Sequence, residues 1–157
     1  MKRIILLFFI IILIIGSKNF TFASYRSNRT SDDIQNYLQE IFDYRIIIWN
    51  DFITDQDRSI KDIESNLKKF IAEPLLTIDL DNFKHIMENP TSYELIQNVY
   101  INNCKLQYNR MGSKIYIVNI GWDLVKDTEI IYEEYDYIVE LIQIENKWLL
   151  KNYELYL

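Results

Sequence analysis

The chain has 157 residues, with 17 Lys and Arg against 23 Asp and Glu, one His and one Cys. This length suits a single domain, and one His with one Cys excludes a disulfide scaffold and a Cys/His zinc cluster. The net charge of −6 argues against electrostatic binding of nucleic acid, and 15% aromatic residues argue against disorder. Three Gly and two Pro leave little room for glycine-rich phosphate loops.

The N-terminal segment, residues 1–23, has the layout of a secretory signal peptide. A basic start precedes an unbroken apolar run over residues 4–15. As a helix this run spans about 18 Å, too short for a hydrocarbon core of about 30 Å. Small residues then precede a predicted cleavage site between Ala23 and Ser24. The alternative is an uncleaved N-terminal anchor that extends to Ala23.

Both interpretations predict a secreted protein or one on the outer face of the cell envelope. Without residues 1–23 the chain has 14 basic and 23 acidic residues, a net charge of −9. Nucleic acid and anionic lipid both repel such a charge, so we expect membrane contact only if residues 1–23 are retained. Residues 24–30 are polar and predict a flexible lead-in to one domain over residues 31–157. Abundant Ile and scarce Ala are typical of a bacterium with an AT-rich genome.

The first part of this domain has the periodicity of helices. Apolar residues at spacings of three and four predict helices over residues 32–53 and 59–72. Pro74 is expected to end the second helix. A short third helix is predicted over residues 79–88, where an Asn-Pro pair ends it.

The remainder of the chain has the period of two that is typical of strands. Strands are predicted over residues 100–108, 115–124, 135–144 and 148–155. The second of these strands has one fully apolar face, made of Tyr116, Val118, Ile120, Trp122 and Leu124. Helices followed by a meander of strands predict an α+β domain, with the helices packed on one face of a curved antiparallel sheet.

The closing hairpin over residues 137–154 reads YIVELIQIENKWLLKNYE. Together with the long first helix, it resembles the nuclear transport factor 2-like superfamily, whose domains are cystatin-like α+β cones, over most of residues 32–157. The first helix, with FDYR at residues 42–45, also resembles domains that precede amidase domains in exported clostridial proteins. The superfamily includes isomerases, dehydratases, cyclases, ligand carriers and interaction modules, so this fold does not imply one function. No catalytic constellation of the superfamily matches this chain residue by residue.

Three features could carry chemistry, and each has a simpler structural interpretation. His85 with Asp81 could act as a general base, but a surface histidine fits as well. Cys104 could act as a nucleophile, but a cysteine on an apolar strand face fits a core position better. The acidic pairs at residues 55–57 and 79–81 lack the Gly and Glu of a calcium loop and suit loops and helix caps. No catalytic residue, metal ligand or cofactor is predicted.

Two groups of residues are predicted as binding sites. On the central strand, one face carries aromatic residues and the other polar residues, so a ligand pocket would use one of the two sets: Tyr116 and Trp122, or Asn119 and Asp123. Further along, acidic residues alternate with tyrosines in a pattern that suits docking of a basic partner. The predicted docking residues are Tyr132, Glu133, Glu134, Tyr135 and Tyr137. The alternatives are aromatic core packing for the first group and a charged edge strand for the second.

Three functions are compatible with these patterns. The scarcity of catalytic side chains favours an exported, non-catalytic binding or interaction module. The superfamily resemblance implies a small-molecule-binding or cyclase/isomerase-like domain that uses the cone cavity. An uncleaved N-terminal segment would suit a membrane-tethered component of an envelope complex or an immunity-type protein. The partner is then a protein or a small molecule, and a homodimer is an open alternative.

Overall fold

The computed structural model describes residues 31–55, 58–89, 93–126 and 129–157. The predicted signal peptide, its cleavage site and the lead-in over residues 24–30 lie outside the described residues. The elements are α1 (Ser31–Thr54), α2 (Ile60–Leu67), α3 (Leu75–Glu88), β1 (Leu95–Arg110), β2 (Ser113–Lys126), β3 (Glu129–Ile144) and β4 (Lys147–Leu155).

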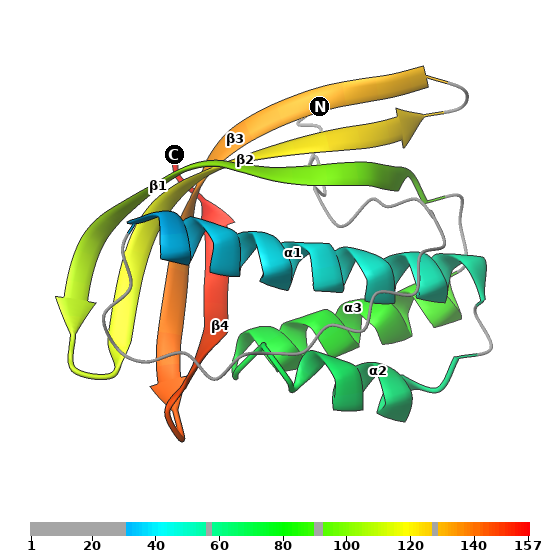
Figure 1. Ribbon diagram of the computed structural model, residues 1–157. Coiled ribbons are helices and arrows are strands. Elements are labelled where there is room, and N and C mark those ends of the chain that lie inside the picture. The colour runs from blue at the N-terminus through cyan, green and yellow to red at the C-terminus, as the bar shows by residue number, and fades with distance from the viewer. Residues whose placement is uncertain (1–30, 56–57, 90–92, 127–128) are drawn as a thin grey trace.

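The four strands form one antiparallel sheet in the order β1-β2-β3-β4. Figure 1 shows the sheet curving around α1, with the three helices on its concave side. The predicted α+β class, with helices packed on a curved antiparallel sheet, is confirmed. Sequential antiparallel pairing follows from the short connections between the strands.

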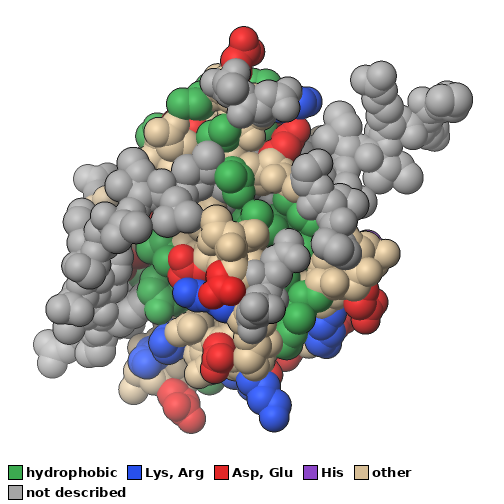
Figure 2. Space-filling model, turned by 90° about the vertical axis from the view of Figure 1, so that its right-hand side faces the viewer, with side chains coloured by type: hydrophobic (Ala, Val, Ile, Leu, Met, Phe, Trp, Pro, Cys, Tyr) green, Lys and Arg blue, Asp and Glu red, His purple; other side chains and the backbone are tan. Residues whose placement is uncertain are grey.

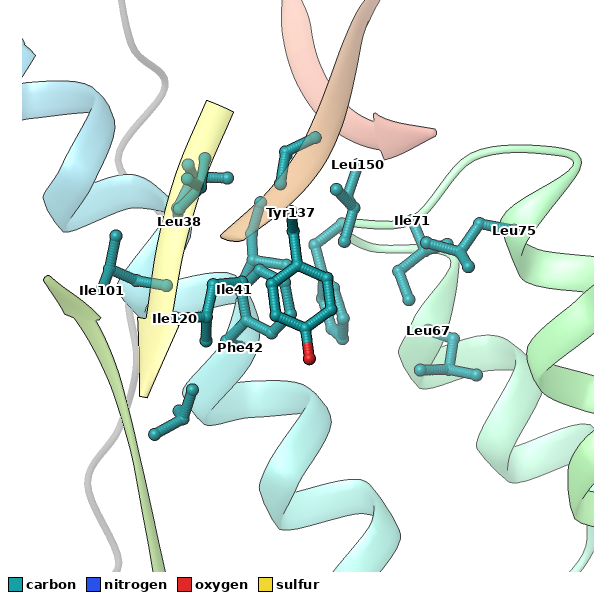
Figure 3. Packing of buried hydrophobic residues seen from close by; sticks show 14 of the residues in the cluster. Leu38, Ile41, Phe42, Leu67, Ile71, Leu75, Ile101, Ile120, Tyr137 and Leu150 are labelled. Carbon is teal, nitrogen blue, oxygen red and sulfur yellow. The ribbon is translucent and has the colours of Figure 1, made fainter. Parts of the chain in front are cut away.

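The core lies between α1 and the concave face of the sheet. The predicted apolar face of β2 is confirmed, because all five of its side chains are buried. In Figure 3, Tyr137 of β3 lies beside Phe42 and Ile41 of α1, with Leu150 and Ile71 at one side of this group. Burial of so many large side chains provides most of the stabilisation of the fold, at about 25 cal/mol per Å² of apolar surface.

The second helix is shorter than predicted. It begins after Ser59, whose hydroxyl accepts a hydrogen bond from the Lys61 N–H (3.2 Å), but it ends at Leu67. The expected last turn, residues 70–72, instead hydrogen-bonds to β4. The Ala72 N–H donates to the Leu150 carbonyl (2.8 Å), and the Leu150 N–H donates to the Phe70 carbonyl (2.9 Å). The helix therefore ends early, because the backbone groups of residues 70–72 hydrogen-bond to β4 although the sequence pattern there is helical.

The third helix begins four residues before its predicted start, at Leu75. Pro74 occupies its N-cap, so this proline lies at the start of α3 and not at the end of α2. Proline suits the first residues of a helix because its missing N–H has no helical acceptor there. Asp79 consequently lies in the second turn of α3, and the helix-cap role predicted for it is wrong.

Irregular pairing in β1 changes which of its residues face the core. Its register with β2 shifts at three places, one of them between Ile101 and Asn103. The alternation predicted from the sequence placed Tyr100 and Cys104 on one face. In the structure Ile101 and Cys104 are buried, whereas Tyr100 points outward. The extra residue at the shift reverses the alternation and bends the strand.

β3 begins at residue 129, earlier than predicted, and β4 pairs only with its second half. The pairing of β3 with β4 runs from Ile144 to Tyr137, and one further hydrogen bond joins the Tyr156 N–H to the Asp136 carbonyl (2.9 Å). Residues 129–135 pair with β2 on one side and with no strand of the described chain on the other. We call residues 129–135 the edge segment, and Figure 1 shows it as the uppermost strand.

Candidate functional site

The side chains of the edge segment divide between the two faces of the sheet, because successive residues of a strand point in opposite directions. Tyr132 and Glu134 lie on the outer face, away from the helices. Glu133 and Tyr135 lie on the helix side, at its rim, where Tyr135 pairs with Ile120 of β2. The structure therefore brings these four predicted docking residues together along one strand but not on one face.

The outer face carries a hydrogen-bonded network that joins β1, β2 and β3. The Asn102 amide donates to Asn119 Oδ1 and to the Tyr132 hydroxyl, both at 3.0 Å. The Asn119 amide donates to Asp136 Oδ1 (2.9 Å), and the Tyr132 hydroxyl donates to Glu134 Oε2 (2.8 Å). These bonds hold the exposed groups in place, which lowers the entropy lost when a partner binds.

Asp123 extends the same polar surface toward β1. Its Oδ2 accepts hydrogen bonds from the Asn98 amide (2.8 Å) and from the Tyr100 hydroxyl (2.7 Å). The hydrogen bond to this carboxylate, together with partial burial, raises the pKa of Tyr100. The rings of Tyr100 and Tyr132 lie 6.3 Å apart. Both predicted polar residues of β2, Asn119 and Asp123, thus belong to the outer surface that Tyr132 shares.

Gly121 makes room for Tyr132. A Cβ atom at Gly121 would lie 2.3 Å from the Tyr132 hydroxyl oxygen and 2.8 Å from two ring carbons. The phenol ring therefore rests directly on the backbone of β2, which only a residue without a side chain allows. Sequence analysis missed this contact, and its one signal was a glycine inside a strand pattern.

On the helix side of the edge segment, the Tyr135 hydroxyl donates to Glu133 Oε2 (3.1 Å). Partial burial and this hydrogen bond raise the pKa of Tyr135. The next residue on the same face, Tyr137, is buried, with its ring 6.4 Å from Trp122 and 5.8 Å from Tyr153. Tyr137 therefore does not belong to the exposed patch, because core side chains cover the sheet from this point.

The two pairs of residues considered for a ligand pocket lie on opposite faces of β2, as their spacing predicts. Tyr116 and Trp122 are buried on the concave face, and Trp122 makes an edge-on contact with Phe42 of α1 at 5.8 Å. Asn119 and Asp123 lie on the outer face, so the backbone of β2 separates the two pairs. Core side chains occupy the concave face at Tyr116 and Trp122.

The edge segment combines exposed apolar side chains with acidic charge. β3 contains five acidic residues and no Lys or Arg. Ile130 is 56% exposed and Tyr132 is 50% exposed. Figure 2 shows hydrophobic and acidic side chains together at the top of the molecule, near the far end of the β2–β3 hairpin, while most visible Lys and Arg side chains lie in the lower half.

The residues considered for catalysis lie away from this surface. His85 is exposed on α3, where its Nδ1 lies 3.4 Å from the Asn89 amide, and Asp81 instead pairs with Lys84 at 2.8 Å. Cys104 is buried, as predicted, and burial raises the pKa of its thiol to about 12. Such a thiol stays protonated near neutral pH and lacks the thiolate form that acts as a nucleophile.

A buried ion pair between α1 and α3 was not predicted. Arg45 Nη2 lies 2.9 Å from each carboxylate oxygen of Asp79, and both side chains are almost fully buried. The guanidinium carbon lies 4.8 Å from the ring centre of Tyr153. Burial raises the pKa of Asp79 to about 6, although the Arg45 charge acts in the opposite direction. The sequence contained one indication that Arg45 is buried, because it lies on the apolar face of α1 between Phe42 and Trp49.

No protein-family model matches this chain, and no curated protein matches it at a significant level. Within the described residues, no helix is long and apolar enough to cross a membrane. The same part of the chain has no group of three or more His, Cys, Asp or Glu side chains placed to hold a metal ion.

Proposed function

We propose that this protein is an exported, non-catalytic interaction module that binds a basic segment of a partner protein at the edge segment of β3. The observation that carries the proposal is the alternation of exposed Ile and Tyr side chains with carboxylates on a strand that has no Lys or Arg.

Tyrosine suits such a surface because its ring provides a large contact area with few rotatable bonds. The carboxylates of Glu133 and Glu134 already accept hydrogen bonds from Tyr135 and Tyr132. Each carboxylate keeps further acceptor positions that a Lys or Arg side chain can use. We expect binding to weaken as salt rises, because exposed charges are screened over about 10 Å at 0.1 M salt.

The proposal includes a nuclear transport factor 2-like architecture and export directed by residues 1–23. The order of the elements and the position of α1 on the concave side of the sheet support the architecture. Export rests on the sequence of residues 1–23 alone. A membrane-tethered or immunity-type protein would present the same patch while retaining that segment.

The test is capture of binding partners by the full chain, expressed in a secreting bacterial host. The double variant Tyr132→Ala/Tyr135→Ala is compared with Tyr108→Ala/Met111→Ala, which removes two exposed side chains near the β1–β2 turn. We expect a salt-sensitive partner that the control variant retains and the patch variant loses. Equal recovery by both variants would exclude the patch as the binding site. The mass of the secreted protein identifies its N-terminus, and retention of residues 1–23 would contradict cleavage.

A further inference from the structure

At Val99 and Ile101, the open edge of β1 is covered by side chains of α1. The Gln39 amide nitrogen donates to the Val99 carbonyl (2.8 Å), and its oxygen accepts from the Ile101 N–H (2.8 Å). The Gln35 amide donates to the Ile101 carbonyl (2.6 Å). Gln39 therefore offers β1 the same donor and acceptor that the backbone of a neighbouring strand would offer.

The open edge of β4 is occupied at Leu150. Ile71 makes a parallel bridge to Leu150, and the two hydrogen bonds that flank it satisfy both backbone groups of Leu150. The edge segment of β3 differs from both of these edges. The Asp136 carbonyl is the last group on this side of β3 that receives a backbone hydrogen bond within the described residues.

The backbone groups of the edge segment have a defined direction. Because Asp136 points its carbonyl toward the β4 side, alternate residues before it point their N–H and C=O groups the same way. These residues are Glu134, Tyr132 and Ile130. Each pairs with a residue of β2 by register, but its backbone polar groups face away from β2.

We propose that an extended basic segment of the partner adds to the sheet here as a further strand. This inference rests on the function proposed above and specifies how the partner binds. The docking side chains lie on both faces of the sheet, Tyr132 and Glu134 on one and Glu133 and Tyr135 on the other. A strand that runs along the edge touches both sets and also satisfies the backbone groups between them.

The charge of the edge segment determines the chemistry of that strand. Acidic side chains stand on both faces, so Lys or Arg is favoured at neighbouring as well as alternating positions of the partner. A second copy of this chain is disfavoured at this edge, because two edge segments would bring Glu133 and Glu134 against like charges. The contrary interpretation is that the acidic side chains protect this edge against any added strand. The experiment below distinguishes such protection from binding of a basic strand.

The probes are three eight-residue peptides, measured against the full chain by calorimetry. The first contains Lys and Thr in adjacent pairs, so that both of its faces are basic. The second has Glu in place of Lys. The third keeps the Lys residues but carries N-methyl groups on alternate residues, which removes backbone donors at constant charge. We expect the first peptide to bind, the second not to bind, and the third to bind at least 10-fold more weakly.

Two variants place the binding at the edge segment. Ile130→Pro removes a backbone N–H that faces the open edge, whereas Ile130→Thr changes the same side chain and keeps the N–H. We expect at least a 10-fold loss of affinity for the proline variant alone. Glu133→Gln/Glu134→Gln should also weaken binding, compared with Glu40→Gln/Glu88→Gln on the helices. In the wild-type protein, the basic peptide should slow hydrogen exchange at Ile130, Tyr132 and Glu134.

Equal affinity for the methylated and unmethylated basic peptides would overturn strand addition and leave the proposed acidic docking surface intact. Absence of binding by every basic peptide would also overturn strand addition. The tyrosine variants in the capture experiment then decide separately whether the patch binds a partner. A dimer with slow exchange at the same amides would show that a second copy occupies the edge and would likewise overturn the inference.

Discussion

The edges of β1 and β3 show two treatments of the same physical problem. An open strand exposes a row of backbone donors and acceptors that another chain can pair with. At Val99 and Ile101 of β1, Gln35 and Gln39 occupy these groups from inside the molecule. On the edge segment of β3, the described residues provide acidic and aromatic side chains but no strand for the backbone groups that face away from β2.

The difference shows that a covered edge needs a neighbouring element with the right spacing. Gln35 and Gln39 are four residues apart, so they lie on the same face of α1 and reach successive groups of β1. The last residue of β4, Leu155, pairs with Tyr137 of β3. No helix of the described chain takes the place of β4 along the preceding residues of β3. The edge segment is therefore mostly exposed, and under the proposed function its charge and its tyrosines select the partner.

The largest expected effect on stability comes from breaking the buried ion pair between α1 and α3. The same helix α1 carries the glutamines that cover β1. Asp79→Ala leaves the buried charge of Arg45 without its carboxylate and should lower the free energy of unfolding by about 3–5 kcal/mol. Urea denaturation measures this loss. Asp81→Ala removes an exposed acid of the same helix and should change stability little. If Arg45→Met/Asp79→Leu is as unstable as Asp79→Ala, uncompensated charge is not the cause.

The same carboxylate predicts a pH dependence. The pKa of Asp79 in the folded state, about 6, lies above its ordinary value of 3.8, so the folded protein binds a proton more readily than the unfolded chain. Its contribution to stability is therefore fully present below pH 4 and is lost as the pH rises to 6. Relative to Asp79→Asn, the wild type should lose stability between pH 4 and pH 7, because the buried carboxyl must give up its proton over this range. Urea denaturation at four pH values checks this, and a constant difference would contradict it.

The difference between the two edges can be tested by removing the glutamine that covers β1. Gln39→Ala removes the partners of the Val99 carbonyl and the Ile101 N–H, which should lower stability by about 1–3 kcal/mol. Hydrogen exchange at Ile101 should become faster, approaching that of the edge segment. Glu40→Ala changes the adjacent, exposed residue of α1 and serves as the control. Unchanged exchange at Ile101 in Gln39→Ala would show that the glutamine does not protect this edge.

The smallest effect on stability is expected on the β3 side. Gly121→Ala pushes the end of the exposed Tyr132 side chain off the sheet, so the protein should stay folded with a slight loss of stability. Binding of the basic peptide should fall, because Tyr132 loses its hydrogen bonds to Asn102 and Glu134. Calorimetry and denaturation measure the two effects. In a Tyr132→Ala background the substitution at Gly121 should have no effect, and a persistent effect there would point to another cause.

Parts of the fold were predictable because local pattern and final environment agree. The faces of β2 follow the period of two without interruption, since both of its neighbours pair with it over most of its length. The long first helix was predicted to within one residue at each end, because its apolar face is continuous. The start of β3 was missed, because residues 129–135 are exposed except for the half-buried Glu133 and so show no apolar alternation.

The patch itself was predicted only in part. The alternation of acidic residues with tyrosines pointed to Tyr132, Glu133, Glu134 and Tyr135, which lie on one strand, three of them exposed and Glu133 half-buried. It also included Tyr137, which has the same residue type and spacing but lies where α1 packs against the sheet. Sequence spacing does not record where another element begins to cover a strand.

The sequence by itself determined the α+β class, the faces of β2 and the burial of Cys104, because these depend on apolar periodicity within single segments. Only the tertiary structure decided the end of α2 at β4, the burial of Asp79 with Arg45, the glutamine cover on β1 and the open edge of β3. Each of these depends on backbone or charged groups that meet across tens of residues. Whether their hydrogen bonds find a partner within the chain depends on which element comes to lie beside them, and no local pattern specifies that element.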